Sequence, residues 1–157
     1  MAGALCVLLL GACSKSGGSG SSATTTAGTG AATAACALLT KAEVAQATGQ
    51  SIAFSRQANL GSVSTCTFGS LSGFAVVLSV TSTPAAGLSS DIPGLGNLVS
   101  NYQLTPVSGV GDQAYGGAAA IIARKGNTAF AIVYTAIGGG NHEQALKTMA
   151  TDVVSRL

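Results

Sequence analysis

The chain has 157 residues, a length typical of a single domain. Charged residues make up 8% of it, against about 25% in ordinary soluble domains, and the formal net charge is +2. So weak a charge without a basic cluster argues against nucleic-acid binding, and the absence of Trp argues against an aromatic platform for stacked bases. We expect no nucleic-acid partner.

The N-terminus has the pattern of a bacterial lipoprotein signal. A short apolar stretch, Ala4–Leu10, leads into Gly11, Ala12 and Cys13. Small residues let a signal peptidase approach the backbone, and the cysteine thiol is the nucleophile that takes diacylglycerol. The stretch holds about ten apolar residues, whereas a transmembrane helix needs about 20, and an ordinary secretory signal needs no cysteine there. We expect a signal peptide over 1–12 and a lipid on Cys13, which anchors the chain to the extracytoplasmic face of the cell membrane.

A flexible spacer is predicted between the anchor and the folded part. Residues 13–35 contain the lipidated cysteine and then almost only Ser, Gly, Thr and Ala. Such a segment buries nothing and reaches about 25 Å as a coil. A single domain is then expected over 36–157.

The remaining cysteines predict one structural disulfide. Cys6 leaves with the signal peptide, so Cys36 and Cys66 are the pair in the exported domain. Outside the cytoplasm an even pair usually forms a disulfide, whereas redox pairs commonly have the spacing Cys-x-x-Cys. With both cysteines bonded, the single histidine cannot complete a zinc site, and we expect no metal and no cofactor.

The first half of the domain predicts one helix and three strands. Thr40-Lys41-Ala42-Glu43 forms a capping box that starts a helix over 41–48, and Gly49 supplies the left-handed residue after its last turn. Strands are expected at 51–57, 64–68 and 73–81. The third strand places its larger apolar side chains on one face, namely Phe74, Val76, Leu78 and Val80.

The second half predicts further helical turns, a hairpin and a final helix. Pro84 and the break at Pro93-Gly94 indicate helical turns at 85–91 and 95–101. Gly126-Asn127 joins strands at 118–124 and 128–135. After Asn141 as N-cap, an apolar stripe follows at helical spacing: Leu146, Met149, Ala150, Val153 and Leu157. These elements predict an α+β fold, an antiparallel sheet of five or six strands with helices packed on one face.

His142 is the only histidine and therefore the only candidate for a serine-hydrolase base. A catalytic triad would need Asp112 or Asp152 beside it. The segment Gly69-Ser70-Leu71-Ser72-Gly73 places leucine where a nucleophile elbow has serine. We expect His142 to be an exposed residue in the first helical turn and the protein not to be an enzyme, with a serine hydrolase as the alternative.

Two glycine-rich segments have structural explanations. Gly109-Val110-Gly111-Asp112-Gln113-Ala114 opens like a dinucleotide-binding loop, but its sixth residue is alanine and no parallel βαβ unit follows. We expect its glycines to allow a bend, Asp112 to cap a turn and Tyr115 to pack in the core. The triple glycine 138–140 lacks the lysine and spacing of a phosphate-binding loop, which favours a hinge.

Three short motifs in this order carry a family resemblance. They are Cys36-x-Leu38-Leu39-Thr40, Cys66-Thr67-Phe68 and Val107-x-Gly109-Val110-Gly111-Asp112-x-Ala114-Tyr115. With the lipoprotein signal and spacer, residues 36–157 resemble actinobacterial cell-envelope lipoproteins of unknown function and the extracellular sensor domains of some mycobacterial Ser/Thr kinases. The resemblance implies a PsbP-like α+β sandwich and supplies no catalytic residues.

The sequence therefore predicts a lipid-anchored, non-enzymatic binding or sensor-like domain. Its ligand would be a small apolar molecule or a partner protein of the envelope. We expect the site on the sheet face or in a cleft between 85–101 and the 109–115 loop, with Gly109, Gly111, Asp112 and Tyr115 as the binding loop. An accessory subunit of an envelope complex is an alternative role.

Overall fold

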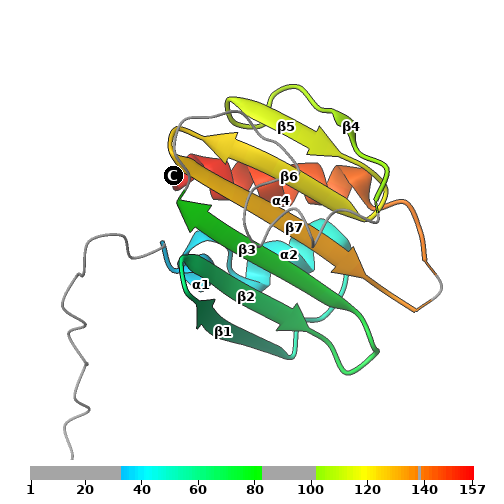
Figure 1. The fold of residues 1–157 in the computed structure, drawn as a ribbon. Helices are drawn as coiled ribbons and strands as arrows, with labels where there is room; N and C mark the ends of the chain where they lie inside the picture. Colours follow the sequence, from blue (N-terminus) through cyan, green and yellow to red (C-terminus); the bar gives the residue numbers. More distant parts are fainter. Residues whose placement is uncertain (1–32, 83–101, 138) are drawn as a thin grey trace, which may run out of the picture.

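The computed structural model describes residues 33–82, 102–137 and 139–157 (Figure 1). Within them, seven strands form one antiparallel sheet in the order β1-β2-β3-β7-β6-β5-β4. The strands are β1 (Phe54–Leu60), β2 (Val63–Gly69), β3 (Ala75–Ser82), β4 (Thr105–Pro106), β5 (Gln113–Gly116), β6 (Ala120–Lys125) and β7 (Thr128–Thr135). The helices are α1 (Ala35–Leu38), α2 (Lys41–Thr48) and α4 (Glu143–Ser155), and all of them cover the same face of the sheet (Figure 1).

The main core lies between this helix layer and the sheet. Every second residue of the central strands points to the helices, including Val76, Leu78 and Val80 on β3, and Phe130, Ile132 and Tyr134 on β7. The helix α4 meets them with its apolar stripe of Leu146, Met149, Ala150 and Val153, each at most 1% exposed. Four residues of the predicted stripe are thus confirmed, while Leu157 lies beyond the helix end and is 37% exposed.

The local structure around α2 is the one that the capping motif predicts. The Thr40 Oγ1 accepts a hydrogen bond from the Glu43 amide, and the Glu43 carboxylate accepts one from the Thr40 amide at 2.8 Å. Leu39 and Val44 are fully buried on either side of this cap, and Gly49 closes the helix at a φ of 68°.

A disulfide joins the helix layer to the sheet, as predicted. It links Cys36 of α1 to Cys66 of β2 with a Cα–Cα distance of 5.0 Å. The Ala35 amide donates to the Ser64 hydroxyl at 3.0 Å beside it. The short α1 is therefore attached to β2 by a covalent and a polar contact.

A second, smaller cluster lies on the other face of the sheet. Its buried residues come from β6 and β7 and are Ala120, Ile122, Ala129, Ala131 and Val133, with Tyr102, Leu104 and Tyr115 packed against them. Tyr115 is half-buried here, and its hydroxyl accepts a hydrogen bond from the Gln113 side-chain amide at 3.0 Å. It thus packs in this cluster and not in the main core that we expected.

Two sequence predictions need correction, and a third lies outside the described residues. The described sheet has seven strands, not five or six, because β4 and β5 are only two and four residues long, too short to be identified from a sequence pattern. The strand expected at 51–57 lies at Phe54–Leu60, since all its residues are exposed and give no apolar pattern. The helical turns expected at 85–91 and 95–101 lie outside the described residues.

Candidate functional site

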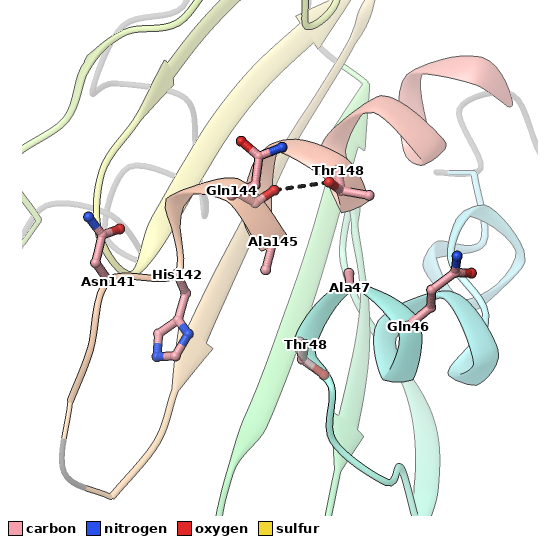
Figure 2. Close-up of a pocket in the computed structure, with 8 residues that line it drawn as sticks. All are labelled: Gln46, Ala47, Thr48, Asn141, His142, Gln144, Ala145 and Thr148. Carbon is pink, nitrogen blue, oxygen red and sulfur yellow. Dashed lines mark hydrogen bonds between the residues drawn. The ribbon is translucent and has the colours of Figure 1, made fainter.

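The candidate site is an open groove between the end of α2 and the start of α4, which we name the α2–α4 groove (Figure 2). Its volume is about 470 Å³, within the range of about 300–1,000 Å³ typical of small-molecule sites. The lining residues are Gln46, Ala47, Thr48, Asn141, His142, Gln144, Ala145 and Thr148. None of these is an acidic residue, a lysine or an arginine.

The two helices are held together at the end away from the groove. Arg156, which follows α4, donates hydrogen bonds and forms an ion pair with Glu43 in the first turn of α2, and it also donates to the Leu38 carbonyl at 2.8 Å. The hydrogen bonds from Arg156, aided by those from Thr40, lower the pKa of Glu43 from 4.5 to about 2. Because α2 and α4 run in opposite directions, this clamp leaves the α2–α4 groove at their other end.

Threonine hydroxyls on both walls are fixed by their own helices. Thr48 donates to the Val44 carbonyl at 2.6 Å and accepts from the Gln50 amide at 3.3 Å. Thr148 donates to the Gln144 carbonyl at 3.0 Å (Figure 2). Since its proton is already donated, the Thr148 oxygen can offer lone pairs to a ligand.

Asn141 and His142 form the end of the groove opposite Gln46 (Figure 2). The Asn141 side chain accepts from the Glu143 amide at 3.0 Å, whereas His142 occupies the N-cap position, so the helix begins one residue later than predicted. The His142 backbone amide donates to the Ala118 carbonyl at 2.8 Å. This bond fixes the start of α4 against the chain that leads into β6.

The His142 imidazole is half-buried, which corrects the prediction of an exposed residue. Its ring lies over Tyr134, with centroids 3.8 Å apart, and Tyr134 in turn stacks on Phe74. The His142 Nε2 is buried and has no hydrogen-bond partner among the described residues. It lies under Gly140, where an added Cβ would come within 2.8 Å of it.

The carboxylates proposed for a hydrolase do not lie at His142. The Asp112 carboxylate accepts from the Gly126 amide at 2.7 Å, at the turn between β6 and β7. Asp152 lies near the other end of α4, about 15 Å along the helix axis at a rise of about 1.5 Å per residue. The described residues therefore do not assemble the triad of the alternative hypothesis.

The predicted binding loop divides between two places outside the α2–α4 groove. Gly109 and Gly111 have φ values of 81° and 59°, and a Cβ on Gly111 would collide with the Arg124 carbonyl oxygen. Asp112 caps the β6–β7 turn, which confirms its predicted role in a turn. Tyr115 lies in the second cluster on the far face of the sheet. The other wall of the predicted cleft, 85–101, lies outside the described residues, so a binding site at this loop stays a prediction.

Comparisons with known proteins give no relative for this chain. No family model, no curated protein and no solved structure matches it. In the part of the chain that the structure describes, no helix has the length and apolar character needed to span a bilayer, and no cluster of three metal-ligating side chains occurs. The resemblance to envelope lipoproteins and the lipid anchor stay predictions from the sequence.

Proposed function

We propose that the protein is a lipid-anchored extracytoplasmic binding protein whose domain takes a small neutral ligand in the α2–α4 groove. The observation that carries this proposal is the uncharged, hydrogen-bonding lining of a groove between two helices that are clamped at their other end. The clamp holds together the two helices that form the walls, and preorganised walls reduce the entropy lost on binding.

The lining favours a ligand that carries hydroxyl or amide groups. Gln46, Asn141 and Gln144 offer side-chain amides that both donate and accept, and Thr148 offers an acceptor. Only Ala47 and Ala145 are apolar, so the groove fits a neutral polar molecule better than the apolar ligand expected from the sequence. A sugar unit with an acetamido group has this chemistry.

A binding role agrees better with the geometry than a catalytic one. His142 stacks on Tyr134, and neither candidate carboxylate reaches it. The role of an accessory subunit stays a prediction and would appear as co-purification at a fixed stoichiometry.

The test combines recovery of a natural ligand with a sugar titration. The full chain is purified in detergent from its native host and examined by native mass spectrometry for an added mass. The same protein is then titrated with N-acetylglucosamine while backbone amide shifts are recorded by NMR. We expect the shifts to concentrate at residues 46–48 and 141–148. No added mass together with no shift in the groove would contradict the proposal.

A pair of threonines on α4 provides a matched control. Thr148 lines the groove, whereas Thr151 is one turn further on and makes the same bond to the carbonyl four residues before it. Thr148→Val should weaken binding about 2- to 10-fold, the effect of one lost hydrogen bond, while Thr151→Val should leave it unchanged. Equal effects of the two variants would place the ligand elsewhere.

A further inference from the structure

Among the residues that the structure describes, the strand β1 leaves one edge of the sheet unpaired. It is the outermost strand, and it pairs with β2 along its whole length, from Phe54 opposite Gly69 to Leu60 opposite Val63 (Figure 1). All seven of its residues are exposed. A terminal strand carries backbone N–H and C=O groups that no neighbour satisfies, so it is a template for another strand.

The opposite edge of the same sheet is protected. Its outermost strand β4 has two residues, Thr105 and Pro106, and proline has no N–H to donate. Short strands and prolines are the usual means by which proteins prevent pairing at an edge. In contrast, β1 contains no proline and keeps regular pairing to its end.

The side chains of β1 are arranged nearly symmetrically about Gln57. Phe54, Arg56, Ala58 and Leu60 share the face that is turned away from the helices, because they pair with β2 residues of that face. The two large apolar residues stand at the two ends, Phe54 at 40% and Leu60 at 84% exposed. Polar residues occupy the other face, with Gln57 in the middle between Ser55 and Asn59.

We propose that two copies of this chain associate through β1, pairing antiparallel about Gln57 to form one continuous sheet. In this register Phe54 lies opposite Leu60 of the second copy, Ser55 opposite Asn59, and Arg56 opposite Ala58. All seven residues of β1 are then paired with a residue of the second copy. The only charged residue of the strand, Arg56, does not lie opposite the Arg56 of that copy. A slip by one residue would set the apolar face of one strand beside the polar face of the other.

The geometry favours a second copy over an unrelated strand. A two-fold axis between the two Gln57 residues makes the contact self-complementary, so one surface patch serves both partners. This axis is perpendicular to the sheet, which puts the helix layers of both copies, and both α1 helices beside β1, on the same side. Two chains tethered to one membrane could therefore pair, and tethering would raise their local concentration. The proposal does not depend on the α2–α4 groove.

The first test places one cysteine on each copy, away from the native disulfide. Phe54 and Leu60 lie opposite each other in this register, on the face turned away from Cys66. Directly opposite residues of an antiparallel pair have Cα atoms about 4.5–5.5 Å apart, within disulfide range. Cells that co-express a Phe54→Cys chain and a Leu60→Cys chain should therefore give a disulfide-linked dimer on a non-reducing gel, several-fold above the wild-type background. Cells that express either variant alone are the matched control, because two copies of the same residue would be about 20 Å apart along the strands. Equal yields from the co-expressed and the single variants would overturn the proposal, as would linkage only to a different protein.

The second test uses the sign of a charge. Ala58 is exposed and lies opposite Arg56 of the other copy in this register. In cells that co-express the Phe54→Cys and Leu60→Cys chains, Ala58→Lys in both chains should lower the dimer yield by repulsion, while Ala58→Glu should keep or raise it. Both substitutions add a long charged side chain at one exposed position, so a fold defect would affect both. Equal dimer yields from Ala58→Lys and Ala58→Glu would contradict this pairing.

Discussion

Glu43 connects the start of one helix to the end of another. Its carboxylate accepts from the Thr40 amide and hydroxyl in the capping box and also from Arg156 after α4. The Glu43 side chain is 24% exposed and the Arg156 side chain 35%. Water therefore screens the ion pair in part, and its contribution to stability is modest although its position is central.

The clamp predicts a loss of stability in acid. The hydrogen bonds from Arg156 hold the folded pKa of Glu43 at about 2, below the ordinary 4.5. A depressed carboxylate pKa stabilises the fold fully above about pH 4.5, and this contribution is lost as the pH falls through about 2. After screening, Arg156→Gln should cost about 1 kcal/mol at pH 7 and much less at pH 2, measured by urea unfolding.

The control for this prediction is Lys125→Gln. It removes one positive charge from the exposed end of β6 without touching Glu43. Its difference from the wild type should change little between pH 7 and pH 2. If both variants lose stability in parallel across this range, the clamp is not the cause.

Two glycines with similar backbone conformations allow the cost of left-handed backbone strain to be distinguished from the cost of a steric collision of an added Cβ. Gly111 has a φ of 59° and Gly126 a φ of 56°, but only at Gly111 would a Cβ meet a backbone atom, the Arg124 carbonyl oxygen. Gly126→Ala should cost about 1 kcal/mol from left-handed strain alone. Gly111→Ala should cost about 3 kcal/mol, because the β6 backbone must also shift. Equal losses in thermal unfolding would contradict the additional collision at Gly111.

At the scale of elements, a helix with local capping signals is predicted well from the sequence, whereas exposed or very short strands are not. The helix α2 has its capping box at Thr40–Glu43 and its terminating Gly49 within ten residues, so the sequence alone predicts where it begins and ends. The strand β1 has no buried face, and β5 is a four-residue strand with Gly111 two residues before it and Gly117 directly after it. Strands that are fully exposed or very short show no clear apolar periodicity in the sequence. This explains why the predicted boundaries of β1 are shifted and why β4 and β5 are not predicted.

The α2–α4 groove could not be predicted from its residues. Asn141, Gln144 and Thr148 follow helical spacing, but the same spacing occurs on any solvated helix face. Their meeting with Thr48 depends on tertiary packing of helix ends that are far apart in the sequence. The glycine motif around Gly111 gave a stronger sequence signal, yet its cause is close contact with the Arg124 backbone.

The disulfide should stabilise the element that begins the domain. Cys36 and Cys66 are separated by 30 residues, and closing such a loop contributes about 3–4 kcal/mol on the chain-entropy model. The double variant Cys36→Ser/Cys66→Ser should lose about this much in urea unfolding. Amide exchange should become faster in α1 and in the adjoining part of β2.

Reduction of the wild-type protein provides the comparison for the disulfide. Under a strong reductant it should unfold at the same urea concentration as the double serine variant. A loss below about 1 kcal/mol in the double variant would mean that the Ser64 contact and the packing of α1 hold this junction without the covalent link.

At the scale of the whole molecule, the α2–α4 groove and the open edge at β1 are two different surfaces. The helix layer carries the α2–α4 groove, and β1 forms an open edge beside α1, where the described chain begins (Figure 1). The groove is formed by the ends of α2 and α4, whereas the open edge faces outward from the sheet. A tether that leads into α1 would therefore hold the domain beside its open edge and leave the groove at the helix ends accessible.

The predicted tether is a lipid on Cys13, and a single substitution tests it. Small residues precede Cys13 and a polar segment of Ser, Gly, Thr and Ala follows it, whereas Leu5 precedes Cys6. Two or three acyl chains, at about 0.8 kcal/mol per buried CH₂, anchor a protein stably, while one chain holds only marginally. Cys13→Ser should therefore lose an alkyne fatty-acid label and leave the membrane fraction or stay uncleaved, with the Cys36–Cys66 disulfide intact. Cys6→Ser, as control, should keep both label and membrane location. Label that persists in Cys13→Ser, or that is absent from the wild type in its native host, would refute the anchor.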